Sequence, residues 1–233
     1  MPALRTVLIR AFWPALLLAC AAATLLVFLW TPVEATMGPI QKIFYLHLPV
    51  AINTFLACTT VCVASIGYLW QRRLWWDDLA AAAARVAVLL CSIVLLTGVI
   101  WAKSAWGQWW AWTPRLTFSL VLWLLYVVYL MIRPSLESPR RRALVSAVYG
   151  VIAFLDVPLV YLSVRLMPDI HPSGIALAPA MRLTLALWFA CLTPVTIGLV
   201  VAGYRVAGCQ RAAQAQPLTP DAPPALDRAG EAA

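Results

Sequence analysis

The segment Trp101-Ala-Lys-Ser-Ala-Trp-Gly-Gln-Trp-Trp-Ala-Trp-Thr-Pro-Arg115 separates two long apolar runs and has five tryptophans within twelve residues. Lys103 and Arg115 flank the tryptophans, and the segment has no acidic residue. One interpretation is an aromatic belt, because Trp is enriched where a membrane meets water. The other is a platform for a flat apolar ligand whose charged edge contacts the cations. A belt usually needs only about one or two Trp at each end of a span.

The apolar runs on both sides of this segment recur along the whole chain. The 233 residues are 64% hydrophobic and 11% charged, whereas about a quarter of residues are charged in soluble domains. Runs of this length indicate a polytopic all-α membrane protein, a bundle of six transmembrane helices with a Trp-rich loop between two of them. The predicted spans are about 11–31, 49–70, 80–101, 116–132, 144–164 and 183–203.

The two ends of the chain need separate interpretations. The apolar run that begins at residue 11 is longer than the core of a signal peptide, so we expect an uncleaved first helix. Residues 206–233 are rich in Ala, Pro and Gln with mixed charge, which predicts a disordered cytoplasmic tail.

Between the first two spans, Ile40–His47 mixes apolar and polar residues as a short interfacial helix would. Pro49 is expected in the first turn of the second span, which places His47 at the membrane boundary.

The distribution of Lys and Arg predicts the orientation. Twelve of the 17 basic residues lie on the side of both termini, and five lie on the side of the Trp-rich segment. Cytoplasmic loops carry the excess of positive charge, so both termini are predicted to be cytoplasmic. The net charge of +8 is therefore explained by topology better than by nucleic-acid binding. His47 and His171, the only histidines, fall on the same outer side as the tryptophans.

These outer residues form a constellation that suits a porphyrin. Imidazole is a common axial ligand of haem iron, and His47 and His171 offer two. The propionates need cations, for which the candidates are Lys103, Arg115, Arg165 and Arg182. The predicted apolar platform is Trp106, Trp109, Trp110 and Trp112.

Each part of this constellation has a plainer alternative. A lone His at a membrane boundary is more often solvated or packed than a ligand, and basic residues at span ends usually anchor the helix. Zinc is disfavoured, since two histidines without a third ligand make a poor site. Asp156 lies within a span, where an ionisable residue suggests function, but a neutral hydrogen-bonded Asp beside a kink at Pro158 is the alternative.

The remaining motifs exclude several activities. The six cysteines show no Cys-x-x-Cys and no zinc spacing, so they are interpreted as small buried hydrophobes. The chain has no Walker A motif, no Gly-x-Gly-x-x-Gly and no nucleophile–base pairing on the outer side. We therefore expect no hydrolytic or redox active site, and at most a lyase-like part in haem transfer.

Three segments resemble the CcmC (haem exporter protein C) family of WWD haem-handling proteins. The segment Trp106–Thr117 is similar to the family's tryptophan-rich signature. Gln41–Ala51 resembles the segment around the family's first conserved histidine, and Asp156–Arg165 through His171-Pro resembles the segment leading to the second. One departure is that the family has Asp after the last Trp, where this chain has Thr113. An Asp there could pair with Arg115 or fix the loop, and threonine cannot carry that charge.

The resemblance implies a six-helix bundle in the bacterial inner membrane. It implies that haem b binds transiently and non-covalently on the periplasmic side, with His47 and His171 as axial ligands. The Trp-rich segment would lie against the porphyrin, with Arg115 meeting a propionate. The implied partners are the periplasmic haem chaperone CcmE, the ABC transporter subunits CcmA and CcmB, the small membrane protein CcmD and membrane lipid, with no nucleic acid.

Two other functions stay open from the residues. A b-type cytochrome subunit for electron transfer would also use two histidines, although such proteins often bury their ligands within spans. A cofactor-free permease subunit of an ABC transporter would leave both histidines dispensable. Its path would need intramembrane polar residues, and these are few, mainly Asn53, Thr97 and Asp156.

Overall fold

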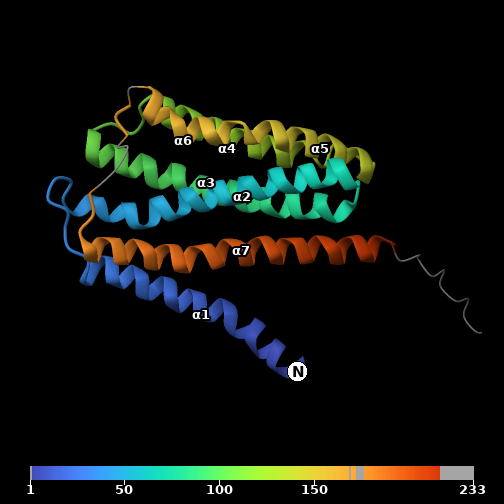
Figure 1. Cartoon of the computed structure of the whole chain (residues 1–233), viewed down its shortest axis with the longest axis horizontal. Helices are drawn as coiled ribbons and strands as arrows, with labels where there is room; N and C mark the ends of the chain where they lie inside the picture. The colour runs from blue at the N-terminus through green and yellow to red at the C-terminus, as the bar shows by residue number, and fades with distance from the viewer. Residues whose placement is uncertain (1, 168, 172–175, 216–233) are drawn as a thin grey trace, which may run out of the picture.

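The structure is a computed structural model that describes residues 2–167, 169–171 and 176–215. Its helices run along one long axis (Figure 1). Their order and bounds are α1 (Pro2–Leu29), η1 (Pro39–Ile43), α2 (Phe44–Gln71), α3 (Leu74–Trp106), α4 (Pro114–Ile132), α5 (Pro139–Phe154), α6 (Asp156–Leu166) and α7 (Pro179–Ala215).

The predicted class, an all-α bundle with six spans, is confirmed. Six helical segments are long and apolar enough to cross a membrane, and α5 continues into α6 to form the fifth of them. In the described part of the chain the only β-type pairing is an isolated bridge between Glu34 and Gly38. The Glu34 carboxylate accepts hydrogen bonds from the backbone N–H groups of Met37 and Thr36. These bonds lower the pKa of Glu34 and hold the turn that leads into η1.

Helix α3 is longer than the predicted span 80–101 at both ends. It begins at Leu74, and Asp77 in its first turn suits the positive end of the helix dipole. It ends at Trp106, and the C-cap residue Gly107 has a φ of 76°, the left-handed conformation that glycine adopts most easily. Trp101 and Trp106 therefore belong to α3 and not to a loop.

Helix α7 and helix α2 also differ from the prediction. Helix α7 extends to Ala215, past the predicted start of a disordered tail at residue 206, because residues 209–215 are good helix formers without Pro or Gly. Residues 216–233 lie outside the described residues. Helix α2 begins at Phe44, directly after η1, so His47 lies in its first turn and Pro49 lies inside the helix.

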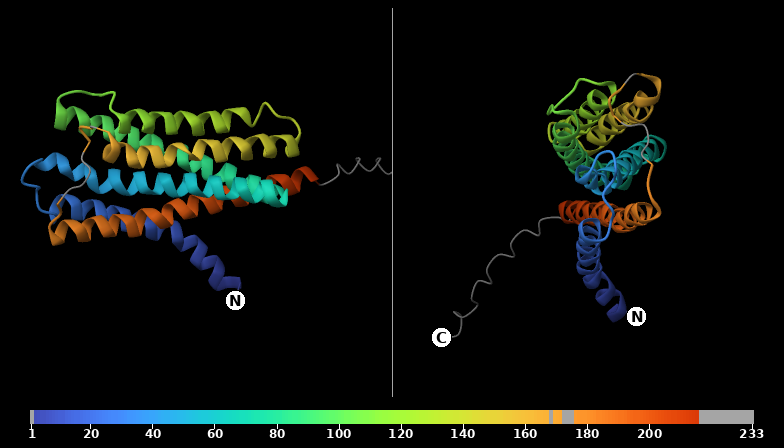
Figure 2. Two further views of the ribbon diagram at one scale, coloured as in Figure 1. Left: turned by 45° about the horizontal axis from the view of Figure 1, so that its top comes forward. Right: turned by 90° about the vertical axis from the view of Figure 1, so that its left-hand side faces the viewer.

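The helices pack in layers, with α2 near the centre (Figures 1 and 2). Helix α2 contacts α3, α5 and α7. Ala80–Ala84 of α3 are all buried, and such small residues let membrane helices approach closely. Gly150 of α5 serves the same purpose, since a Cβ there would lie 2.7 Å from the Ser65 hydroxyl oxygen of α2.

Helix α1 lies outside this bundle, on the far side of α7 in the end-on view of Figure 2. It packs mainly against α7, and only 11% of its membrane-spanning part is buried. The Thr31 and Thr184 hydroxyl groups, 2.8 Å apart, link the end of α1 to α7.

The fifth span is broken near its middle. Helix α5 ends at Phe154 and α6 begins at Asp156, because Pro158 has no N–H to offer to the carbonyl of Phe154. Asp156 is 6% exposed, and its Oδ2 has no hydrogen-bond partner among the described residues.

The two ends of the bundle are named here by what they carry. The tryptophan end holds the start of α2, the end of α3, the start of α4, the end of α6 and the start of α7. The tail end, opposite, holds the end of α2, the start of α3, the end of α4, the start of α5 and the end of α7.

Candidate functional site

A cavity of about 500 Å³ opens at the tryptophan end, between α2, α3, α4, α6 and α7. It is lined along α3 from Ala105 to Cys91, which spans about 20 Å of helix. Most of its wall is apolar, so it reaches deep into the part of the protein that lipid surrounds. This site is called the tryptophan-end cavity. Both histidines of the chain line it.

His47 is held by a hydrogen bond to a neighbouring helix. Its Nδ1 lies 2.8 Å from the Thr97 hydroxyl oxygen of α3. That hydroxyl donates its one hydrogen to the Ile93 carbonyl at 2.7 Å, so it accepts from His47 Nδ1–H. When the Thr97 hydroxyl donates to this carbonyl, the His47 proton lies on Nδ1 and Nε2 keeps its lone pair. Metal-binding histidines are usually oriented in this way by a second group.

His171 lies on the segment between α6 and α7, far from His47 in the sequence, and lines the same cavity. Its ring lies 6.5 Å from the Trp106 ring, in an edge-to-face arrangement. The His47 ring lies 5.7 Å from the Trp101 ring in the same kind of arrangement. The two imidazoles and the Arg115 guanidinium are close enough to interact electrostatically. The structure therefore brings both predicted ligands to one cavity.

Asp169 connects the His171 segment to the start of α4. Its Oδ1 accepts a hydrogen bond from the His171 backbone N–H at 2.8 Å, and its Oδ2 accepts one from the Arg115 backbone N–H at 3.0 Å. Thr113, the N-cap residue of α4, makes no side-chain capping bond. A carboxylate from another part of the chain thus caps α4, next to the position where the WWD signature has its Asp.

The predicted platform divides into two groups. Trp106 and Trp110 line the cavity, together with Trp101. Trp109 and Trp112 do not line it and are 60% and 76% exposed. The Trp110 ring nevertheless contacts the Trp112 ring edge to face, with centroids 5.7 Å apart.

The four candidate cations divide in the same way. Arg115 and Arg165 line the cavity. Lys103 donates instead to the Gly107 carbonyl at the end of α3, at 2.9 Å, and lies over the Trp109 ring. Arg182 is exposed and does not line the cavity.

Two donors at this cavity lack acceptors within the described part of the chain. Arg115 donates through Nη2 to the Tyr161 carbonyl at 3.1 Å, while its buried Nε has no hydrogen-bond partner. The buried indole N–H of Trp110 has none either. Unsatisfied buried donors are costly, and an anionic ligand would satisfy them. A flat apolar group with a metal centre and carboxylates at its edge therefore fits the residues present.

Sequence reasoning missed the roles of three residues of this site. Asp169 gave no signal beyond its place two residues before His171, and its contact with α4 depends on tertiary structure. Trp101 was counted in the cluster but not assigned to the platform, because its position on α3 was unknown. Thr97 was noted as an intramembrane polar residue, but periodicity could not pair it with His47.

The fold and the cavity define a polytopic helical membrane protein with a deep apolar site that two histidines line. The family of such proteins described as Heme exporter protein C, CcmC, matches residues 2–218. The chain belongs to this family.

Curated relatives agree with this assignment. The chain is 35% identical over 133 residues to Heme exporter protein C of Rhodobacter capsulatus, covering 54% of this chain and 55% of the relative. It is 31% identical over 159 residues to Heme exporter protein C of Escherichia coli K12, covering 66% of this chain and 64% of the relative. The chain thus aligns with less than two thirds of the length of these relatives.

Proposed function

We propose that this chain binds haem b as a transient, non-covalent cargo in the tryptophan-end cavity and delivers it during cytochrome c maturation. The observation that carries the proposal is that His47, His171 and Arg115 line the same deep cavity. Haem supplies the iron and the reactive vinyl groups. The protein supplies two imidazoles, an apolar wall that excludes water, and cations for the propionates.

The proposed recipient is the periplasmic chaperone CcmE. The orientation predicted from the basic residues turns the tryptophan end toward the periplasm of the bacterial inner membrane. Trp109 and Trp112, both largely exposed, would then face a partner there. CcmA, CcmB and CcmD, the partners implied by the family resemblance, would complete the haem exporter complex.

The experiment is an absorption titration of the detergent-purified chain with haem. The proposal expects a saturable Soret band with the spectrum of bis-histidine coordination. When purified CcmE is added with the rest of the complex, the haem should move to CcmE, measured after the two proteins are separated. A band that grows without saturation, as haem partitions into micelles, would contradict it. Fast reoxidation by a quinone, with no transfer to CcmE, would favour the cytochrome alternative.

Thr97 provides a test that keeps both ligands in place. We expect Thr97→Val to weaken haem binding by about tenfold, because loss of the partner of a ligating histidine typically costs 10–100-fold in affinity. Thr97→Ser should bind like the parent protein. The measurement is the dissociation constant from the same titration.

Thr59 on α2 is a matched control for Thr97. It makes the same type of bond to the carbonyl four residues earlier, at 2.8 Å, but it is exposed and does not line the cavity. Thr59→Val should leave the affinity unchanged. Equal affinities for Thr97→Val and the parent protein would argue against a role of Thr97 in orienting His47.

Substitutions of Asp169 are expected to distinguish its role in capping α4 from its role in positioning His171. Asp169→Ala should lower the unfolding free energy by about 1 kcal/mol, the usual value of a lost cap. It should also weaken haem binding, since the His171 backbone loses its anchor. Adding Thr113→Asp restores a carboxylate to the N-cap position and should recover stability but not haem binding. Recovery of both would assign the whole effect to the stability of α4.

A further inference from the structure

A second cavity, of about 490 Å³, lies at the tail end of the bundle. It is enclosed by α3, α4, α5 and α7 and is called the tail-end cavity. Its charged lining is distinctive. The charged residues are Asp77, Asp78, Arg85, Arg133, Arg142 and Arg211.

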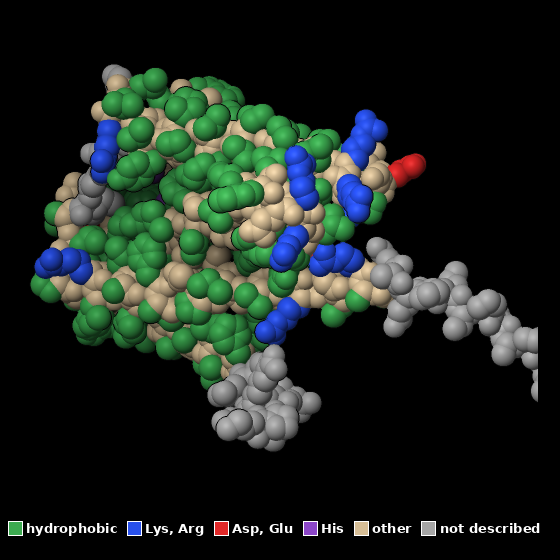
Figure 3. Space-filling model, turned by 45° about the vertical axis from the view of Figure 1, so that its right-hand side comes forward, with side chains coloured by type: hydrophobic (Ala, Val, Ile, Leu, Met, Phe, Trp, Pro, Cys, Tyr) green, Lys and Arg blue, Asp and Glu red, His purple; other side chains and the backbone are tan. Residues whose placement is uncertain are grey.

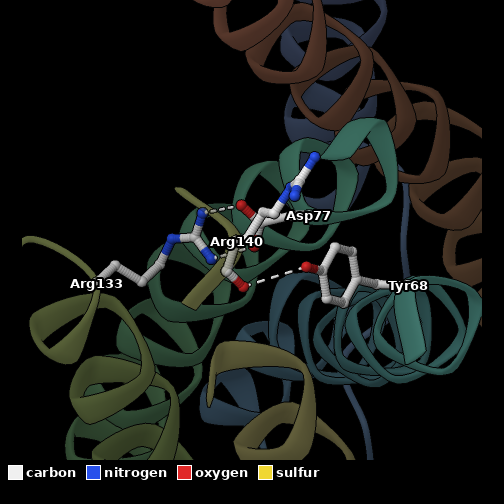
Figure 4. Close-up of polar contacts among 4 residues, drawn as sticks. All are labelled: Tyr68, Asp77, Arg133 and Arg140. Atoms are coloured by element: carbon white, nitrogen blue, oxygen red, sulfur yellow. Dashed lines mark hydrogen bonds and ion pairs between the residues drawn. The ribbon is translucent and has the colours of Figure 1, made fainter. Parts of the chain in front are cut away.

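Two of the four guanidinium groups are already paired. Arg133 forms two hydrogen bonds to the Asp77 carboxylate, at 2.6 and 2.8 Å (Figure 4). Arg211 forms an ion pair with Asp78. These pairs use both carboxylates of the cavity, so the lining keeps an excess of two positive charges on Arg85 and Arg142.

Arg142 has no carboxylate within ion-pair distance among the described residues. Its Nε is buried and has no hydrogen-bond acceptor among them. A guanidinium that lines a cavity and has no carboxylate to neutralise it favours an anionic ligand there. Phosphate oxygens match the guanidinium fork especially well.

Arg85 sets the depth at which this ligand would lie. It is two turns beyond Asp78 on the same face of α3, about 10 Å further along the helix. It is exposed, although its neighbours Ala84 and Val86 are buried. Its guanidinium lies close to Gly203 of α7, where an added Cβ would be 3.9 Å from Nη2. A cation this close to the end of a span can extend its side chain to the headgroup region of a bilayer.

The surface around the cavity agrees with this location. Most of the Lys and Arg side chains visible in Figure 3 gather at the tail end, and hydrophobic side chains cover the surface between the ends. Basic pockets between membrane helices are typical binding sites for phospholipid headgroups.

We propose that the tail-end cavity binds the phosphate headgroup of an anionic phospholipid through Arg142 and Arg85. The acyl chains would leave the cavity along the lipid-facing surface beside Arg85. The Arg133–Asp77 and Arg211–Asp78 pairs position the helices around the phosphate. This site is at the opposite end of the bundle from the histidines, so it is independent of the proposed haem function.

The test is native mass spectrometry of the full chain released from nanodiscs of phosphatidylglycerol or phosphatidylcholine with matched acyl chains. We expect preferential retention of phosphatidylglycerol. Arg142→Gln and Arg85→Gln should each weaken it about fivefold, the effect of one basic side chain at an anionic surface. Arg142→Lys should retain most of the binding.

Arg141 is the matched control, because it neighbours Arg142 on α5 but is exposed and outside the cavity. Arg141→Gln should leave lipid binding unchanged, and all variants should elute as monodisperse protein. An effect of Arg141→Gln equal to that of Arg142→Gln, or equal retention of the two lipids, would overturn the proposal. The positive charge of the cavity would then be assigned to binding an acidic protein partner. Displacement of the lipid by millimolar inorganic phosphate would assign the site to a soluble anion instead.

Discussion

The His47→Ala variant is expected to bind haem far more weakly than the parent protein, with an altered Soret band. Loss of a group that merely orients a metal ligand costs 10–100-fold, so loss of the ligand itself should weaken haem binding by at least about 100-fold. His47 lies in the first turn of a packed helix, and its Nδ1 is fixed by Thr97. No other described histidine on α2 could replace it. The titration of purified variants with haem measures the effect.

The His171→Ala variant distinguishes a two-ligand site from a one-ligand site. If both imidazoles bind iron, His171→Ala leaves a weaker complex with an altered spectrum, because His47 remains. Added imidazole should restore the spectrum of either variant by occupying the space that the side chain left. Parent-like spectra in both variants would refute the ligand assignment, and the Trp-rich segment would then be a belt or a docking surface.

The Asp77→Ala variant is expected to unfold far more easily than the parent protein. The side chains of Asp77 and Arg133 are 4% and 12% exposed and share two hydrogen bonds. Removing one partner of a buried ion pair leaves an uncompensated charge and typically costs about 3–5 kcal/mol. The free energy of unfolding in detergent micelles, from a denaturant titration followed by tryptophan fluorescence, measures this loss.

Two comparisons show whether the loss comes from the unpaired charge. The double variant Asp77→Asn with Arg133→Gln removes both charges and should recover more than half of the lost stability. The neighbouring pair is the matched control, since Arg211 is 39% exposed. Asp78→Ala should cost about 1 kcal/mol or less, as more exposed pairs do. Equal losses in Asp77→Ala and Asp78→Ala would contradict the argument from burial.

The sequence was sufficient to predict those features of the fold that a single physical effect determines. Long apolar runs have few stable arrangements in lipid, so the number of spans followed from hydropathy alone. The break at Pro158 followed from the missing N–H group. The ends of α3 did not, because Trp, Asp and Lys there are compatible with helix or loop, and packing decides between them.

The candidate site could be predicted only as a list of residue types. The orientation argument placed both histidines on one side, but it could not show that they line one cavity. It treated the four tryptophans as equivalent, and of the four candidate cations it favoured Arg115. The structure separates Trp110, which lines the cavity, from exposed Trp112, and Arg115 from Lys103. These differences arise from helix rotation and from the fold of the segment that Asp169 anchors.

The position of α1 beside α7 has a consequence for the order of biosynthesis. A ribosome that has completed α1 must add roughly 150 further residues before α7 begins, which takes on the order of ten seconds or more. During that interval α1 stands in the bilayer without its main partner, while α2 and α3 already associate as a hairpin. A truncated chain that ends before residue 179 should therefore expose Ala23 and Val27, which are buried in the full chain, to lipid-soluble cross-linkers.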